Sequence, residues 1–337
     1  MVTLCNMGFL SPDGRSYSFD QRANGYGRGE GIAVVVIKLL ADAVKDGDTI
    51  RAVIRSTGTN QDGRTPGVTQ PSKDAQESLI RHVYNKANLD FSTTRYIEGH
   101  GPGTPLGDPI EVSSIGAVFA RQRTEAEPLV VGSVKSNIGH LEAASGLAGL
   151  IKTVLVLERG LIPPIADFQQ PNPQIDTKFL NIKFPSEAMP WPGKGLRRAS
   201  INSFGFGGTN SHVVLDDALH YLELHNISGY HNTLTLSPQQ PISQESDETC
   251  LPEPCKSSNA WAEDTSTASS SFSPQLFVLS AMDKLALQRM IIQYDKHLAS
   301  KPHPKRSMDS YLSSLAYTLA SRRSRFPWRS TQASSSR

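Results

Sequence analysis

Short apolar runs alternate with amphipathic stretches along the first 217 residues, and this alternation restricts the chain to folds that are built of layers. Several runs are apolar throughout, which is typical of strands in a sheet that is covered on both faces. The pattern predicts an α/β fold in which helices pack on a sheet. The expected strands are residues 31–40, 50–58, 94–101, 129–137, 197–205 and 210–215.

Two helices are expected between these strands. Residues 71–90 open with Pro71 and Ser72, a common helix start, and then repeat apolar residues on one face. Residues 140–160 are largely apolar and reach Gly160, a common helix stop.

The composition changes after this region. Residues 237–274 are rich in Ser, Thr and Pro and nearly lack aliphatic residues, which predicts a disordered linker or insertion. Residues 275–300 then predict a strand followed by an amphipathic helix, and residues 310–330 predict a helix that runs into a loop. We therefore expect three regions: a first domain over 1–217, a low-complexity segment over 218–275 and a small α/β piece over 276–337.

The charge balance argues against a polyanionic partner. Lys and Arg number 34 and Asp and Glu 32, which leaves a formal net charge of +2, so we expect no nucleic acid and no membrane partner. The most apolar run, residues 146–157, is too short to span a bilayer and contains Lys152. Three cysteines (Cys5, Cys250 and Cys255) do not make a disulfide framework in a chain of this size, which favours a reducing, cytoplasmic setting.

Two histidines stand where a strand passes into a helix. His100 lies at the end of the expected strand 94–101 among glycines, and His140 opens the second expected helix five residues after Lys135. A histidine at such a junction can stay neutral and offer a ring N–H to a developing oxyanion. Two histidines of this kind could share one oxygen.

Other interpretations of these segments stay open at this point. Each histidine could be a structural residue, and Asp108 and Glu111 could be a helix cap and its dipole partner. The glycine-rich stretches 25–31 and 205–208 suggest phosphate binding, although neither has the spacing of a dinucleotide or P-loop motif. No metal is expected, because the histidines have no compact ligand spacing.

Five segments together resemble one family. FDQRANGYGRGEG, NQDGRTPGVTQPS, EGHGPGTPLGDPIE, VKSNIGHLEAASGLAGLIK and ASINSFGFGGTNSHVVL occur in this order in the β-ketoacyl synthase domain of type I polyketide synthases, most like the highly reducing fungal kind. The resemblance covers residues 1 to about 217. FVLSA and LAYTLASRRSRFPWRS resemble the start of the linker between the ketosynthase and acyltransferase domains.

The resemblance implies a thiolase-like fold and a decarboxylative Claisen condensation. In the family, a cysteine accepts an acyl chain, and malonyl on the phosphopantetheine of an acyl carrier protein is decarboxylated to an enolate that attacks it. His100 and His140 match the histidines that stabilise this enolate, Lys135 the lysine that organises the site, and Glu111 an acid in its hydrogen-bond network. The implied partners are an acyl carrier protein, the rest of a polyketide synthase and a second copy in a homodimer, with no directly bound cofactor.

The same resemblance assigns residues that contact the pantetheine arm or the acyl chain. A phenylalanine of the FGFGG loop would act as a gate between two pockets, and Phe206 is the preferred candidate. The implied binding residues are Thr104, Asn137, Phe204, Phe206, Gly207 and Gly208.

The sequence departs from the family at two places. The nucleophile motif of the Asp-Thr-Ala-Cys-Ser-Ser type is absent, and Cys5 stands in a segment that does not match it. Pro102 replaces a family threonine whose hydroxyl binds pantetheine, and proline offers neither a hydroxyl nor a backbone N–H.

Two hypotheses follow from these departures. The chain is either a ketosynthase that lacks its first half, as a piece of a working polyketide synthase, or a non-catalytic remnant that at most binds a carrier protein or dimerises. In both cases we expect this chain alone not to condense acyl units. We expect malonyl decarboxylation near background, because half of the pocket wall would be missing.

Overall fold

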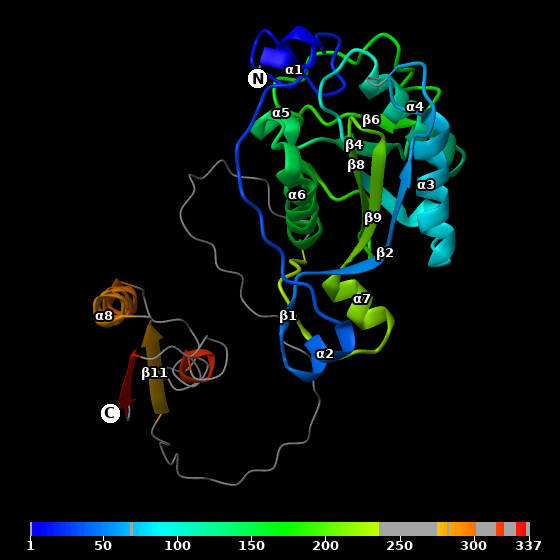
Figure 1. The fold of residues 1–337 in the computed structure, drawn as a ribbon. Helices are drawn as coiled ribbons and strands as arrows, with labels where there is room; N and C mark the ends of the chain where they lie inside the picture. The colour runs from blue at the N-terminus through cyan, green and yellow to red at the C-terminus, as the bar shows by residue number, and fades with distance from the viewer. Residues whose placement is uncertain are drawn as a thin grey trace. The chain divides into compact units, whose positions relative to one another are not determined.

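The computed structural model describes residues 2–67, 70–235, 275–281, 283–300, 315–319 and 328–334. The chain divides into two compact units, Met1–Lys256 and Ser257–Arg337 (Figure 1). The predicted disordered segment 237–274 lies outside the described residues. Among the described helices, none combines the length and apolar character needed to cross a bilayer.

A six-stranded mixed sheet forms the centre of the first unit. The three strands at one side of the sheet are antiparallel, and the remaining neighbours run parallel. Parallel strands bring their carboxyl ends to the same edge, so the loops after β3 and β4 meet there. In spatial order the strands are β2 (Ala52–Gln61), β9 (Thr209–Asp217), β8 (Arg198–Phe204), β3 (Thr94–Glu98), β4 (Leu129–Gly132) and β6 (Ile182–Lys183).

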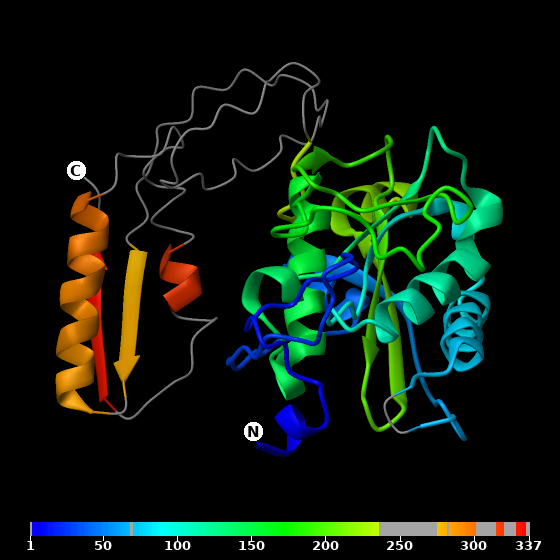
Figure 2. The ribbon, with the colours of Figure 1, turned by 90° about the horizontal axis from the view of Figure 1, so that it is seen from above.

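Helices cover both faces of this sheet, as the apolar strands predict. Helices α3 (Lys73–Lys86) and α4 (Gly107–Phe119) pack on one face and α6 (Ser145–Arg159) packs on the other (Figure 2). Alternate strand residues supply the two cores. In β3, Tyr96 packs with the α6 side and Ile97 with the α3 and α4 side.

The start of α3 and the end of α6 lie where the sequence predicts. The other two ends were predicted wrongly, because α3 ends at Lys86 and α6 begins at Ser145. The side chain of Ser72 accepts a hydrogen bond from the backbone N–H of Ala75 (3.2 Å) and caps α3. Helix α6 ends at Arg159, and Gly160 caps it with a left-handed φ of +62°. A Cβ at Gly160 would lie 2.8 Å from the guanidinium carbon of Arg197, so this stop requires glycine.

Shorter elements complete the first unit. Strand β1 pairs in parallel with β10, and β5 pairs with β7 in antiparallel fashion. The unit continues through α7 and β10 past residue 217, and the domain boundaries predicted at 217 and 275 stay predictions. These elements are α1 (Val2–Asn6), α2 (Leu40–Lys45), β1 (Thr49–Ile50), η1 (Phe91–Thr93), η2 (Ala120–Gln122), α5 (Lys135–Ile138), η3 (Glu142–Ala144), β5 (Leu161–Ile162), β7 (Met189–Pro190), α7 (Ala218–Leu224) and β10 (Tyr230–His231).

The second unit contains the predicted strand and helix, β11 (Gln275–Ala281) and α8 (Lys284–Ser300). Residues 315–319 are helical, within the expected helix. The loop predicted at the end of residues 310–330 is wrong, because β12 (Trp328–Ser334) pairs antiparallel with β11. A distant strand supplies this pairing, and the local sequence gives no sign of it.

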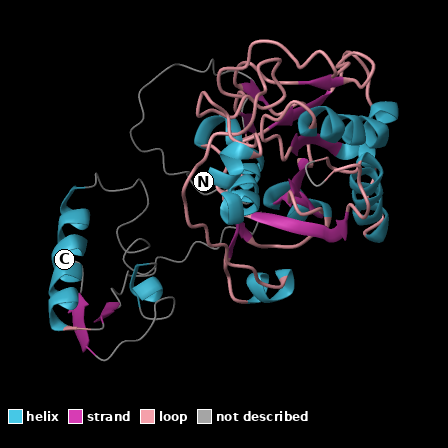
Figure 3. Cartoon of the chain, turned by 45° about the horizontal axis from the view of Figure 1, so that its top comes forward, coloured by secondary structure: helices cyan, strands magenta, loops and turns pink. Residues whose placement is uncertain are grey.

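The strand predicted over residues 31–40 is also wrong. Residues 31–39 form no ladder with any described residue and are drawn as loop in Figure 3, and α2 begins at Leu40. Ile32, Val34 and Val36 are 97%, 80% and 96% exposed. The β-branched pattern favours a strand, but a strand also needs a partner backbone.

We expect the exposed apolar side chains of residues 31–39 to promote self-association of the chain. A Val34→Lys, Val36→Lys double variant should bind less of a fluorescent apolar dye and self-associate less by light scattering, because two exposed apolar side chains are replaced by charges. Its free energy of unfolding should stay within about 0.5 kcal/mol of the parent, as is usual for exposed positions. Phe179→Lys, at an apolar residue that is 78% exposed elsewhere, is the control and should change both readings less. Unchanged dye binding in the double variant would contradict the prediction.

A second prediction concerns acid stability. Burial lowers the pKa of His212 in β9 from 6.5 to about 3. Between these values the unfolded chain binds a proton that the folded chain does not. The free energy of unfolding should therefore fall as the pH falls below 6.5, by about 1.4 kcal/mol per pH unit from this residue.

Urea unfolding at pH 6.0, 5.0 and 4.5 measures this slope. His212→Asn, which cannot titrate, should lose that component of the pH dependence. Val214→Ala, on the same strand, is the control: it should lower stability by a similar amount at each pH. Parallel curves for the parent chain and His212→Asn would show that the histidine does not titrate differently on folding.

Candidate functional site

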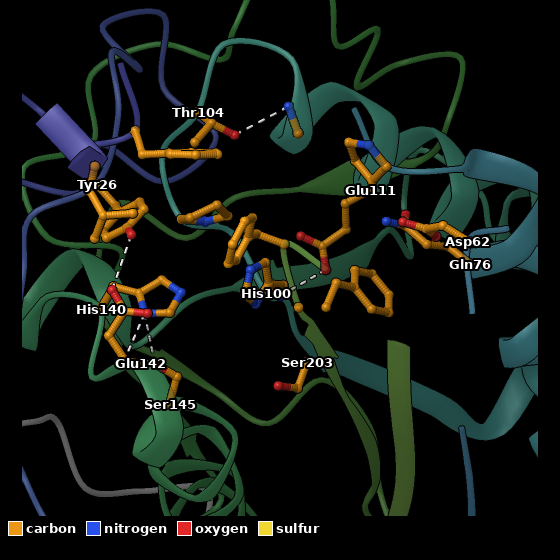
Figure 4. Close-up of a pocket in the computed structure, with 18 residues that line it drawn as sticks. Tyr26, Asp62, Gln76, His100, Thr104, Glu111, His140, Glu142, Ser145 and Ser203 are labelled. Atoms are coloured by element: carbon orange, nitrogen blue, oxygen red, sulfur yellow. Dashed lines mark hydrogen bonds between the residues drawn. The ribbon is translucent and has the colours of Figure 1, made fainter. Parts of the chain in front are cut away.

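A pocket of about 320 Å³ opens beside the loops that follow β3 and β4. Its wall combines residues from segments that lie far apart in the sequence, as Figure 4 shows. Tyr26, His100, Glu111, His140 and Phe204 all line it. All five segments that carry the family resemblance meet at the pocket, because Asp62 of NQDGRTPGVTQPS also lines it.

The two candidate histidines face each other on the pocket wall. Their ring centroids are 5.6 Å apart and the rings are nearly perpendicular, at 85°. His100 comes from the loop after β3, and His140 from the turn between α5 and α6. The structure therefore brings together two residues that are 40 positions apart in sequence.

The surroundings of His140 fix which ring nitrogen carries its proton. The backbone N–H of Glu142 donates to His140 Nδ1 (2.9 Å), and Ser145 Oγ lies 3.1 Å from the same atom. Glu142 reaches this position with a left-handed φ of +53°. Since Nδ1 accepts, the proton of the neutral ring is on Nε2.

The charge state of His140 follows from its environment. Burial lowers its pKa to about 4, and the nearby charge of Lys135 acts in the same direction. At neutral pH the ring is therefore uncharged and can donate through Nε2–H. A neutral donor in a partly dry pocket suits an oxygen that becomes negative.

His100 is held by its backbone. Its N–H donates to Glu111 Oε1 (2.7 Å), and its ring Nδ1 is buried without a partner among the described residues. Burial, then the charge of Lys135 and the neighbouring His140, keeps the pKa of His100 well below its usual value of 6.5. His100 is neutral at pH 7 for the same reasons as His140.

Lys135 stands behind the pocket wall. Its Nζ donates to the carbonyl oxygen of His100 (2.5 Å), and the side chain is buried. Burial lowers its pKa, whereas the charges of Glu98, Glu111 and Asp108 oppose that shift. Lys135 acts on the pocket through the backbone of His100.

Glu111 has a more specific environment than a dipole partner of the helix would need. Oε1 accepts from the His100 N–H and from Asn202 Nδ2 (2.9 Å), and Oε2 accepts from the Gly101 N–H (2.8 Å). Burial raises its pKa, and these hydrogen bonds oppose that rise. Glu111 therefore clamps the loop that carries His100.

Asp108 has a similar role and lies about a turn earlier on α4. Oδ1 accepts from the N–H groups of Gly103 and Thr104 (3.1 Å each), and Oδ2 accepts from the Phe19 N–H (2.7 Å). The residue lies inside the helix, after the N-cap position of Leu106. Asp108 therefore joins the His100 loop to the residue 19 region.

The pantetheine candidates divide between the pocket wall and its surroundings. Thr104 and Pro102 line the pocket, and Thr104 Oγ1 accepts from the Gly107 N–H (3.2 Å). Gly101, between His100 and Pro102, has a φ of +39°, and a Cβ there would lie 2.6 Å from the Phe19 ring. Asn137 is exposed and does not line the pocket.

The FGFGG segment supplies two phenylalanines to the pocket wall. Phe204 is buried with its ring centroid 6.1 Å from that of His100. Phe206 lines the pocket but is 64% exposed. Its ring centroid lies 5.6 Å from that of Phe9. Gly207 and Gly208 belong to the turn between β8 and β9 and do not line the pocket.

The glycine-rich stretch 25–31 does not form a phosphate loop. The His140 N–H donates to the Gly27 carbonyl (2.7 Å), and the Gly29 N–H donates to the His140 carbonyl (3.0 Å). These glycines allow the stretch to pair with the backbone of His140. No group of three or more metal-ligating side chains occurs among the described residues.

Several residues of the site were missed in the sequence. Tyr26 lies with its ring 4.7 Å from that of His140, and its hydroxyl donates to Glu142 Oε1 (3.0 Å). Arg28 binds the same oxygen (2.9 Å). Tyr26 and Arg28 lie in the GYGRGEG stretch and Glu142 in the GHLEAASG stretch, so the motifs contained the signal, but no spacing rule shows that they meet.

Family models match nearly the whole chain. The β-ketoacyl synthase N-terminal domain matches residues 1–43 and the β-ketoacyl synthase C-terminal domain residues 51–169. The ketoacyl-synthetase C-terminal extension matches 171–246, and a CurL-like polyketide synthase C-terminal model matches 275–337.

Curated relatives agree with these models. Highly reducing polyketide synthase 40 of Fusarium mangiferae is 45% identical over 98% of this chain and 14% of its own length. Highly reducing polyketide synthase alnA of Emericella nidulans is 49% identical over 99% of this chain and 13% of its own length. The chain thus spans about one seventh of the length of these relatives.

Solved ketosynthases share the fold. The ketosynthase from module 6 of the bacillaene synthase of Bacillus subtilis matches with a TM-score of 0.74 and 31% identity, over 99% of this chain and 50% of that one. The oxazolomycin ketosynthase domain of Streptomyces albus matches with a TM-score of 0.73 and 28% identity, over 99% and 49%. The thiolase-like fold is therefore confirmed, and the chain belongs to the β-ketoacyl synthase family, as a ketosynthase region of the polyketide synthase type.

Proposed function

We propose that the pocket binds a malonyl thioester and stabilises the enolate that forms when carbon dioxide leaves. The observation that carries this proposal is the pair of neutral histidines on one wall, 5.6 Å apart. Loss of carbon dioxide leaves an electron pair on the carbon next to the thioester carbonyl, so negative charge develops on the carbonyl oxygen. Donors fixed in advance stabilise that charge without reorganising.

The residues have distinct roles in this step. His140 donates Nε2–H to the oxygen, and His100 provides the second ring at the same place. Lys135 does not reach the pocket but lowers the pKa of both rings and holds the His100 carbonyl. Glu111 fixes the His100 backbone.

The rest of the family reaction extends the proposal. Malonyl would arrive on the phosphopantetheine of an acyl carrier protein, with Thr104 contacting the arm and Phe206 acting as the gate. The enolate carbon would then attack the carbonyl carbon of an acyl chain held as a cysteine thioester, and the cysteine thiolate would leave. Cys5 is exposed and does not line the pocket, so we assign no acyl transfer to it.

The whole polyketide synthase supplies the other proposed partners, including a second copy in a homodimer. The remnant hypothesis gains no support from the comparisons, which match polyketide synthases and ketosynthases along the chain. From the sequence we expected decarboxylation near background because a portion of the wall would be missing. The structure forms a pocket that keeps both histidines, and we now expect a measurable rate.

The test is decarboxylation of malonyl-pantetheine by the purified chain, followed as acetyl-pantetheine by mass spectrometry. His140→Ala should lower the rate above background by roughly 10²-fold, the usual effect of removing one oxyanion donor. His225→Ala, at an exposed histidine after α7, is the matched control and should keep the parent rate. Equal rates for the parent and His140→Ala would refute the proposed role.

Pro102 gives a second prediction. Pro102→Thr restores a hydroxyl at the pocket wall and should tighten malonyl-pantetheine binding by about 0.5–1.5 kcal/mol, the usual contribution of one hydrogen bond. Malonyl-N-acetylcysteamine, which lacks most of the arm, is the control substrate and should gain less. The KM ratio of the two substrates measures the effect, and an unchanged ratio would show that the hydroxyl has no partner on the arm.

A further inference from the structure

A buried chain of hydrogen bonds connects strand β9 with the loop of His100. His212 Nδ1 lies 2.7 Å from Asn202 Oδ1, and Asn202 Nδ2 donates to Glu111 Oε1 at 2.9 Å. Glu111 in turn accepts from the N–H groups of His100 and Gly101. His212, Asn202 and Glu111 are 0%, 3% and 2% exposed, so water does not compete for these contacts.

The direction of the first hydrogen bond follows from chemistry. An amide oxygen can only accept, so His212 Nδ1 must carry the proton. Burial holds the ring neutral at pH 7, with a pKa of about 3, so Nε2 carries no proton. Nε2 has no hydrogen-bond partner among the described residues. His212 therefore offers a single donor, and that donor faces Asn202.

This donor determines how the Asn202 amide is turned. With Oδ1 facing His212, the Nδ2 group faces Glu111 and donates to it. A rotated amide would place its oxygen against the Glu111 carboxylate, where two acceptors would face each other. The His212 donor and the Glu111 carboxylate together favour the one orientation in which Glu111 receives three N–H donors.

An apolar core residue at position 212 could not donate a hydrogen bond to Asn202. Val214, two residues along β9, is fully buried and packs in the hydrophobic core with Phe204 and Val83. A valine or leucine at 212 would fill space but leave Asn202 Oδ1 without this donor, and an unpaired buried polar atom is costly. His212 leaves Nε2 unpaired among the described residues, and its Nδ1–H supplies the donor that Asn202 needs.

We propose that His212 and Asn202 are positioning residues for the proposed enolate site: His212 orients the Asn202 amide, Asn202 orients Glu111, and Glu111 fixes the backbone that carries His100. This inference rests on the proposed function for its catalytic meaning. Neither residue lines the pocket or touches a reacting atom.

The experiment compares variants that differ in side-chain volume and in whether a hydrogen-bond donor remains at position 212. His212→Leu removes the donor and keeps much of the volume. His212→Asn keeps a donor, because its amide nitrogen occupies about the place of Nδ1. Val214→Ala is the matched control, since it removes buried apolar contacts of the same strand and leaves the relay, the hydrogen-bond chain from His212 through Asn202 to Glu111, unchanged. Asn202→Asp, which is isosteric and replaces the donor to Glu111, tests the same step if His212→Leu does not fold.

The first readout is amide hydrogen exchange of His100 and Gly101, measured by NMR relative to the Ile97 amide in β3. His212→Leu and Asn202→Asp should speed the relative exchange by about tenfold, and His212→Asn should stay within about threefold of the parent. Val214→Ala should leave the ratio unchanged, because general loss of stability accelerates all three amides together.

The second readout is malonyl-pantetheine decarboxylation. His212→Leu should lower kcat by about tenfold with little change in KM, and His212→Asn should restore kcat. An unchanged exchange ratio in His212→Leu, or equal loss in His212→Asn and His212→Leu, overturns the positioning role. Expected exchange ratios in a parent chain that shows no decarboxylation would keep the relay and refute the proposed function instead.

Discussion

The site depends on two buried carboxylates that hold one loop. Glu111 and Asp108, a turn apart on α4, together accept hydrogen bonds from the backbone of His100, Gly101, Gly103 and Thr104. Backbone N–H groups in a buried loop need acceptors, and the sheet cannot supply them beyond the end of β3. A loop held through its backbone leaves its side chains free to face the pocket. The helix therefore serves as a scaffold for the histidine.

The same burial sets the charge of the site. Removing water disfavours the charged form of each imidazole, and the Lys135 ammonium behind the wall adds to this effect. Lys135 itself stays compatible with burial because Glu98, Glu111 and Asp108 surround it. The arrangement places two neutral donors at the pocket surface, which suits a carbonyl oxygen whose negative charge develops only during the reaction.

The sequence predicted the layers, the start of α3 and the end of α6, and it singled out His100 and His140, which the structure brings together. These features depend on local patterns or on the rule that parallel strands end at one edge. It did not predict β12 or the Tyr26, Glu142 and Arg28 cluster, because these arise from pairing between distant segments. Residues 31–39 show the reverse case: their β-pattern is clear, but pattern alone does not provide a partner strand.

The histidines and Phe206 differ in how firmly they are held. The histidine side is fixed by short hydrogen bonds to buried groups, whereas Phe206 stands at a glycine-rich turn and is 64% exposed. Glycines beside an aromatic residue let that residue swing without straining the flanking strands. Under the proposed function, the fixed polar wall keeps its donors in register with the developing charge, and Phe206 is the gate for the thioester arm. Glycines also flank His100 and His140, but there buried hydrogen bonds hold the backbone, whereas Phe206 is largely exposed.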